Sequence, residues 1–319
     1  MQYVGIKTQQ SRNNARSMAL LVLFPLLVMG LVLLFFVILY GVGGVDYRNS
    51  PYGSMFGFVW PIFLQTVPWV LGGVAVWFLI AYFANSAIIK NATGSRPLDR
   101  KQNKRVYNLV ENLCMAQGMP MPKVNVIRDS SLNAFASGIN AKSYTVTLTT
   151  GIIEKLDDQE LEGVIAHELS HIRNRDVRLL IVSIVFVGIF AMIAQIAFRV
   201  FLSSGRSRGN KKGGAAVLLI VALLAAVGYG LSTLMRFAIS RKREYLADAR
   251  AAEMTRNPGA LAMALRKISA DPMVEAVQRD DVAQLFIEHP LKGKKRGAFN
   301  SLFATHPPIE KRIQVLEQF

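Results

Sequence analysis

The stretch that decides how the rest of this chain is interpreted reads Ala166-His167-Glu168-Leu169-Ser170-His171. It has the pattern His-Glu-x-x-His, and on a helix His167 and His171 lie one turn apart on the same face. Both imidazoles can therefore reach one metal ion, and Glu168 is placed to handle the proton of an activated water. The spacing predicts a zinc site built on a helix.

Residues on either side of the motif favour that helix. Asp157 can cap it, with Glu160 three residues later as in a capping box. Glu168 falls near the middle of an apolar stripe, where a carboxylate is costly unless a cation compensates for it. A partly desolvated Glu is also what a general base requires. The stripe consists of Leu161, Val164, Ile165, Leu169 and Ile172.

Composition favours a membrane protein. The mean hydropathy is +0.31 and 52% of the residues are hydrophobic, which is too apolar for an ordinary soluble enzyme. A net charge of +16 is typical of proteins that bind nucleic acid. Here the charges flank hydrophobic runs, so they favour anionic lipid headgroups as the partner, and no nucleic-acid partner is expected. The single cysteine, Cys114, excludes an intramolecular disulfide framework and fits a core position in a reducing compartment.

Four apolar segments are long enough to span a bilayer, for which about 20 residues are needed. The first is too long for a signal-peptide core and is expected to stay as an anchor. Pro61 and Pro68 are expected to break up the loop that precedes the second. The expected spans are residues 18 to about 41, 69–89, 179–198 and 215–235.

Positive residues predict the orientation of these spans, because cytoplasmic segments are enriched in Lys and Arg. Basic residues precede the first span, follow the second and follow the fourth, whereas the loop of residues 42–66 holds only Arg48. Both termini and residues 90–178 are therefore expected in the cytoplasm. The loop of residues 203–214 disagrees, because it is basic and lies on the predicted outer side.

The soluble segments predict a small α+β domain in two parts. Residues 105–116 have helical periodicity, residues 123–127 and 144–148 alternate like strands, and residues 132–138 are expected to be extended. The expected divisions are a cytoplasmic N-terminus (1–17), spans one and two (18–89), a first catalytic part (90–178), a transmembrane hairpin (179–240) and a second catalytic part (241–319).

Two histidines leave a catalytic zinc short of a third protein ligand. The candidates are His289, His306 and the acidic residues. The last two spans form a hairpin, so Glu244 returns to the membrane side of His171, and Asp248 shares its helical face. Asp248 could hydrogen-bond the free ring nitrogen of a ligand histidine. An ordinary ion pair on the same helix, between either carboxylate and a neighbouring arginine, explains these two residues equally well.

Three sequence blocks in this order resemble the HtpX-type membrane zinc metalloproteases, which are relatives of the CAAX prenyl proteases. They are HELSH at 167–171 before the hydrophobic hairpin, SRKREYLAD at 240–248 and THPPIEKR at 305–312. The resemblance covers nearly the whole chain, except for the basic loop at 203–214. It implies a mainly α membrane protein with four transmembrane helices and a zincin-like α+β cytoplasmic domain, in which a small β-sheet accompanies the motif helix.

The resemblance also implies a function and residue roles. The function is a zinc metalloendopeptidase of the cell inner membrane, acting on misfolded membrane proteins, with one Zn²⁺ per chain. The implied zinc ligands are His167, His171 and Glu244, with Glu168 as catalytic base and Asp248 as the residue that orients a ligand. The implied substrate-backbone contacts are Asn133 and the strand Ala134-Phe135-Ala136, and the implied oxyanion-stabilising residues are His306 and Arg312.

Two other functions are compatible with the residues. A CAAX prenyl protease would use the same chemistry, although four spans and a short chain argue against its large intramembrane chamber. A non-enzymatic membrane scaffold or basic lipid-binding protein could carry the motif without activity. Taken alone, His306 is explained as a histidine at a helix start, because His-Pro before a helix needs no catalytic reason. His289, also followed by Pro, is interpreted as structural.

Overall fold

A computed structural model describes residues 6–42, 53–204, 212–237, 242–274, 277, 285–288 and 307–319. The chain divides into two compact units. Unit 1 consists of Met1–Ser17, Phe83–Ile181 and Phe237–Phe319, and unit 2 consists of Met18–Tyr82 and Val182–Arg236.

Unit 1 contains a four-stranded mixed sheet in the order β1-β2-β4-β3. β2 and β4 are parallel, and the two outer pairs are antiparallel. Every residue of β3 and β4 is buried, so these two strands belong to the core. The strands expected at 123–127 and 144–148 are confirmed to within one residue, and the extended segment expected at 132–138 contains β3. The strands are β1 (Arg96–Pro97), β2 (Lys123–Ile127), β3 (Ala134–Ser137) and β4 (Thr145–Thr149).

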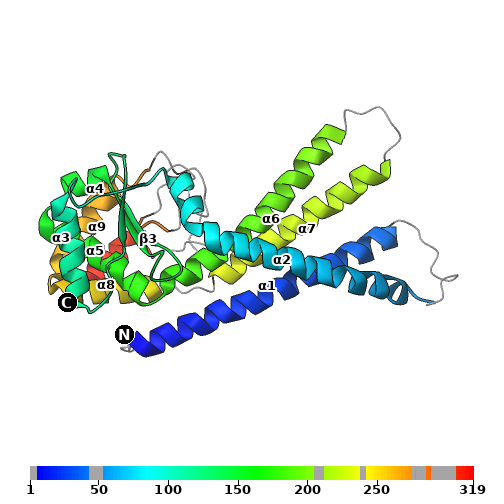
Figure 1. Cartoon of the computed structure of the whole chain (residues 1–319), viewed down its shortest axis with the longest axis horizontal. Helices are drawn as coiled ribbons and strands as arrows, with labels where there is room; N and C mark the ends of the chain where they lie inside the picture. Colours follow the sequence, from blue (N-terminus) through cyan, green and yellow to red (C-terminus); the bar gives the residue numbers. More distant parts are fainter. Residues whose placement is uncertain are drawn as a thin grey trace. The chain divides into compact units, whose positions relative to one another are not determined.

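The motif helix α5 lies at the centre of unit 1, where it contacts α3, α8, α9, β3 and β4 (Figure 1). Its expected capping box is present, because Asp157 and Glu160 exchange side-chain hydrogen bonds with each other's backbone N–H. Every residue from 163 to 170 is buried, so the helix is covered on all sides rather than along one stripe. Gly163 permits this packing, because a Cβ there would lie 3.2 Å from Leu261 of α9. The helices named here are α3 (Lys104–Ala116), α5 (Asp158–Arg173), α8 (Lys242–Thr255) and α9 (Pro258–Ala270), and unit 1 also holds α4 (Thr150–Lys155) and α12 (Ile309–Leu316).

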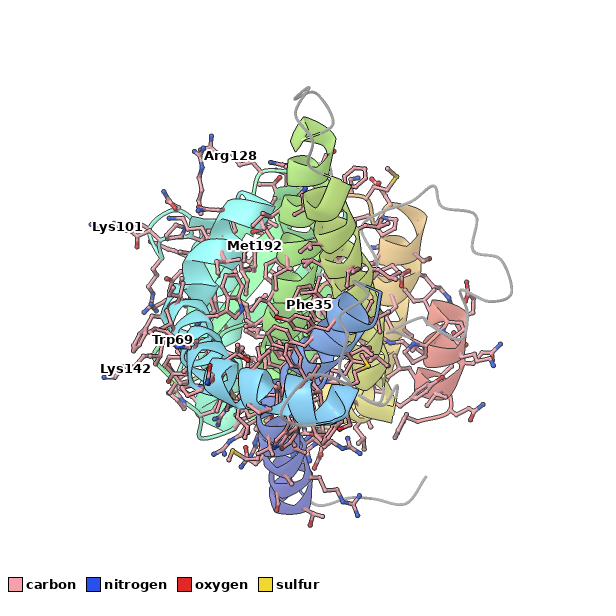
Figure 2. All side chains as sticks on the ribbon, turned by 90° about the vertical axis from the view of Figure 1, so that its right-hand side faces the viewer. Phe35, Trp69, Lys101, Arg128, Lys142 and Met192 are labelled. Carbon is pink, nitrogen blue, oxygen red and sulfur yellow. The ribbon has the colours of Figure 1, made fainter. Side chains whose placement is uncertain are left out.

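Unit 2 is built from parts of four long helices. Among the described residues, three of these helices have stretches long and apolar enough to cross a membrane: Ser11–Gly41, Met55–Ile80 and Asp176–Ile196. The fourth expected span corresponds to α7, whose described apolar stretch, Val217–Leu231, is shorter. Large apolar side chains such as Trp69 and Met192 are exposed, as lipid-facing residues are (Figure 2). The helices are α1 (Ile6–Val42), α2 (Met55–Thr93), α6 (Asp176–Ser204) and α7 (Lys212–Phe237).

The prediction that Pro61 and Pro68 lie in a loop before the second span is wrong, because α2 starts at Met55 and contains both prolines. Each proline removes one helical N–H, a loss that apolar membrane helices tolerate because nearby groups satisfy the freed carbonyls. Ser54 fixes the actual helix start, since its hydroxyl accepts a hydrogen bond from the N–H of Gly57 at 3.1 Å. The apolar stretch of this helix accordingly runs from residue 55 to 80 instead of 69 to 89.

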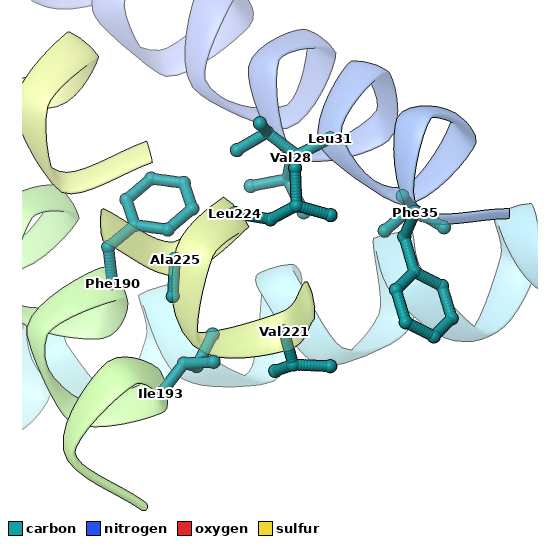
Figure 3. A pocket seen from close by; sticks show the side chains of 9 residues that line it. Val28, Leu31, Phe35, Phe190, Ile193, Val221, Leu224 and Ala225 are labelled. Carbon is teal, nitrogen blue, oxygen red and sulfur yellow. The ribbon is translucent and has the colours of Figure 1, made fainter. Parts of the chain in front are cut away.

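Helices α1, α6 and α7 line an open apolar pocket of about 240 Å³ within unit 2 (Figure 3). Its lining includes Phe35 of α1, Phe190 of α6 and Leu224 of α7. Beside it, Gly228 allows close helix packing, because a Cβ there would lie 2.5 Å from the Phe190 ring. Unit 2 is therefore held together by apolar side chains and close backbone approach.

Candidate metal centre

Three potential metal ligands converge in unit 1 from two helices. His167 and His171 project from α5 and Glu244 from α8, and their ligand atoms all lie within 4.8 Å of one another. The two Nε2 atoms are 3.1 Å apart, and the Glu244 carboxylate oxygens lie 3.7 Å from Nε2 of His167 and 3.6 Å from Nε2 of His171. Ligands bonded to one tetrahedral zinc at about 2 Å are separated by roughly 3.3 Å. The three residues therefore match the spacing of a zinc site.

The orientation of the two imidazole rings also fits a metal ion. Nδ1 of His167 lies 2.9 Å from Oδ1 of Asp248, and Nδ1 of His171 lies 3.2 Å from Oδ2 of Asp176. Each carboxylate accepts a hydrogen bond from Nδ1–H, so each neutral ring carries its lone pair on Nε2. The two lone pairs then face each other beside the Glu244 carboxylate. A cation between them relieves this repulsion, so the donor set fits a bound metal.

Without a metal, a proton can take the place of the cation. Burial alone would lower the pKa of His167, but hydrogen bonds to Asp248 and Glu244 outweigh it and raise this pKa to about 9. The imidazole is therefore protonated at neutral pH in the metal-free protein. A histidine that ligates a metal must be neutral, so metal binding at this site would displace this proton.

Zinc affinity is accordingly expected to fall as the pH is lowered. Below pH 9 a single displaced proton weakens apparent binding by about tenfold per pH unit, because the metal competes with a proton at His167. Chelator competition between pH 6 and pH 8 measures this dependence. An affinity that stays constant over that range would show that His167 is already neutral before the metal binds.

Glu168 is positioned as a buried carboxylate beside the ligands. It is 2% exposed, and burial raises its pKa, while the neighbouring His167 and His171 act in the opposite direction. A carboxyl group whose pKa is moved toward neutrality both accepts and returns a proton readily. This environment matches the role of general base that the sequence predicts.

Asp248 links His167 to an arginine. Oδ1 and Oδ2 of Asp248 accept hydrogen bonds from Nη2 and Nε of Arg312 at 2.7 and 2.8 Å. Burial would raise the pKa of Asp248, but Arg312 and His167 outweigh it and lower this pKa to about 2. Arg312 is completely buried and also donates to the carbonyl of Ile287. These bonds give Arg312 the geometry of a residue that holds Asp248, whereas its oxyanion role stays a prediction.

The segment expected to bind substrate backbone is engaged within the protein. The amide of Asn133 donates to the carbonyls of Pro272 and Glu288 at 2.8 and 2.9 Å. At the outer edge of β3, the N–H of Ile287 donates to the carbonyl of Ala134, and the rings of Phe135 and Phe286 lie 4.6 Å apart. Part of the strand edge 134–136 is therefore paired with residues 286–287.

His306 lies outside the described residues, so its expected role is not placed by the structure. Asp176, the acceptor for His171, was not among the residues expected from the sequence. Its signal is a carboxylate five residues after His171 in the first turn of the next helix, which no zinc-ligand spacing singles out.

Comparison with known proteins gives the family. The model of Peptidase family M48 matches residues 100–319. The protein named Protease HtpX homolog of Bacteroides fragilis is 65% identical over 324 residues, covering 100% of both chains. Its namesake in Dictyoglomus thermophilum is 43% identical over 254 residues, covering 76% of this chain and 81% of that protein. The match to the crystal structure of S. mikatae Ste24p covers 90% of this chain and 62% of the Ste24p chain, with a TM-score of 0.46 and 20% sequence identity. The chain thus belongs to peptidase family M48.

Proposed function

We propose that this chain uses one zinc ion, held by His167, His171 and Glu244, to cleave peptide bonds within membrane proteins. Membership of peptidase family M48 makes it a membrane-associated metalloprotease. The observation that carries the proposal is the convergence of these three side chains, whose spacing and ring orientation fit a metal ion. Misfolded membrane proteins are the proposed substrates, so the cellular role is quality control.

The protein side chains divide the chemistry between them. Zinc, when bound, supplies a Lewis acid that polarises the scissile carbonyl and lowers the pKa of water. Glu168 takes a proton from the attacking water and returns it to the leaving amine. Asp248 and Asp176 keep the rings of His167 and His171 in the tautomer that offers Nε2. His306 is proposed to stabilise the oxyanion.

Substrate backbone is proposed to add to the edge of β3, as extended peptides add to exposed strand edges. Main-chain pairing would permit broad sequence tolerance, because backbone groups are common to all substrates. At Ala134 this edge already accepts the hydrogen bond from Ile287. Pairing along the full strand therefore requires residues 286–287 to leave the edge, and the Asn133 contact with Glu288 has to open with them.

The proposed topology has four spans, with α7 as the fourth, and a catalytic domain that faces the cytoplasm from the inner membrane. Basic residues on the proposed inner side support this orientation. The proposed catalytic parts, 90–178 and 241–319, and the N-terminal segment 1–17 fall within unit 1, which supports the division. Lys101, Arg128 and Lys142 extend outward from this unit (Figure 2).

Removing the metal tests the proposal. Detergent-purified protein is expected to contain about one zinc per chain, as a site with three protein ligands holds. A chelator should abolish cleavage of unfolded casein, zinc should restore it, and chelator already saturated with zinc should have no effect. His167→Ala should lose the metal together with the activity. Full cleavage by metal-free protein would contradict the proposal.

The same assay distinguishes the proposed activity from that of a CAAX prenyl protease. A prenylated CAAX peptide is incubated in parallel with unfolded casein. Cleavage of casein without cleavage of the peptide supports the proposed substrate class. Exclusive cleavage of the prenylated peptide would replace it, and no cleavage of either by zinc-loaded protein would favour a non-enzymatic scaffold.

A further inference from the structure

The second ligand histidine is supported by residues that come from the N-terminal helix and from the start of α6. Nδ1 of His171 donates to Oδ2 of Asp176 at 3.2 Å. On the other side, Oδ1 of Asp176 accepts a hydrogen bond from Nδ2 of Asn13 at 2.6 Å. Asp176 is 2% exposed and Asn13 is 1% exposed, and all three residues belong to unit 1. A continuous hydrogen-bonded path therefore runs from α1 to a metal ligand.

Asp176 is the centre of this path because its charge is balanced from several directions. A buried carboxylate is costly unless it is paired and hydrogen-bonded. Asp176 lies in the first turn of α6, where the helix dipole stabilises negative charge. The guanidinium of Arg243 lies 3.8 Å from its Oδ1 and donates to its backbone carbonyl at 3.4 Å. The His171 ring and the Asn13 amide complete the surroundings.

Asn13 also holds the turn on which Asp176 depends. Its amide donates to the carbonyl of Asn174 at 3.0 Å, and this carbonyl lies at the C-terminus of α5, where helical partners are lacking. The next residue, Arg175, has a left-handed φ of 60°, which is uncommon for a residue other than glycine. One asparagine therefore fixes both the strained turn and the carboxylate that follows it.

We propose that Asp176 and Asn13 are positioning residues for metal binding: Asp176 fixes the ring of His171, and Asn13 fixes Asp176. This inference rests on the proposed metal centre. Each ligand histidine then has its own carboxylate, with Asp248 on His167 and Asp176 on His171. The N-terminal helix thereby becomes part of the support of the catalytic centre, although it lies far from the His-Glu-x-x-His motif in sequence.

Three single variants of the full-length protein in detergent test the proposal. Asp176→Asn is isosteric and lacks the charge, Asn13→Ala lacks the amide, and Asn14→Ala is the matched control. Asn14 neighbours Asn13 and accepts an exposed hydrogen bond from Arg175 instead. Zinc affinity is measured by chelator competition, and the visible spectrum of the Co²⁺-substituted protein reports the ligand geometry.

Asp176→Asn is expected to weaken zinc binding by about 10- to 100-fold and to change the Co²⁺ spectrum, as loss of an orienting partner does. Asn13→Ala should shift both in the same direction by less, and Asn14→Ala should match the wild type. Because Asn13 acts through Asp176, the double variant should bind zinc no more weakly than Asp176→Asn alone.

Several outcomes overturn the inference. They are unchanged zinc affinity and spectrum in Asp176→Asn, a full additive loss in the double variant, and an effect of Asn14→Ala equal to that of Asn13→Ala. Melting of the metal-free proteins is followed in parallel, and a loss of affinity matched by a general loss of stability also counts against it. Failure of the wild type to bind zinc would instead remove the proposed metal centre.

Discussion

Glu168→Gln is expected to lower peptide cleavage by about 10²- to 10⁴-fold, the usual contribution of a general acid–base group, while the zinc content stays at the wild-type level. The substitution keeps the size of the side chain and removes its ability to take a proton. Glu168 is 2% exposed and lies beside the three proposed ligands without being one of them. The measurement is cleavage of unfolded casein, with zinc per chain determined on the same preparation.

A control on the same helix separates catalysis from packing. Glu162→Gln changes a half-buried carboxylate of α5 away from the ligands and should leave cleavage unchanged. Burial raises the pKa of Glu168, so the neutral amide should leave the metal-free protein at least as stable as the wild type. Wild-type cleavage by zinc-loaded Glu168→Gln would remove the catalytic assignment, and loss of zinc in this variant would assign Glu168 a part in metal binding.

Local rules predict those parts of the fold that local interactions determine. The capping box at Asp157 and Glu160 follows from residues three positions apart, and the structure contains both of its hydrogen bonds. The strand predicted at 123–127 likewise depends on consecutive residues, and the structure contains it with the same bounds. Pro61 and Pro68 show where a local rule fails, because α2 continues through both. The rule describes the cost of a missing hydrogen bond, and the packing of a long apolar helix outweighs that cost.

The candidate site divides in the same way. His167 and His171 share a helical face by spacing alone, and so do Glu244 and Asp248. Spacing left the role of the second pair open, and only the family resemblance implied that it joins the histidines. The bond between Asn13 and Asp176 joins residues 163 positions apart, and helical or strand periodicity carries no information over that distance. The same holds for the 64 positions that separate Asp248 from Arg312. The role of Asp248 was expected from the sequence, whereas its bond to Arg312 and the bond between Asn13 and Asp176 become visible only in the folded chain.

Arg312→Met is expected to cause the largest loss of stability, about 3–5 kcal/mol, the usual result of breaking a buried ion pair by removing one partner. For a domain of about 150–250 residues this corresponds to a melting temperature roughly 6–20 °C lower. Arg312 is completely buried and binds both carboxylate oxygens of Asp248, which is 2% exposed. The variant removes the guanidinium from that carboxylate and, among the described residues, leaves only the His167 ring beside it. Thermal melting of the metal-free protein in detergent measures the loss.

The sign of the pH dependence distinguishes this cause from a simple packing defect. In the wild type the depressed pKa of Asp248, about 2, contributes stability that is present above its unfolded pKa near 3.9 and is lost as the pH falls through 2. In Arg312→Met, burial acts on the Asp248 carboxyl without the opposing guanidinium, so its pKa rises. Protonation then becomes easier, and the deficit against the wild type should shrink as the pH is lowered from 7 toward 5. A deficit independent of pH would indicate lost packing alone.

Two further variants separate the contribution of Asp248 to stability from its contribution to metal binding. Arg266→Met removes an exposed ion pair with Glu317 and should cost less than about 1 kcal/mol, because solvent already screens that pair. Combining Arg312→Met with Asp248→Leu removes both buried charges, so much of the lost stability should return. Zinc affinity should not return with it, since Nδ1 of His167 then lacks the carboxylate 2.9 Å away that orients the ring. Stability and metal binding would thus separate at Asp248, which is the result expected if Arg312 serves the metal centre by holding this carboxylate.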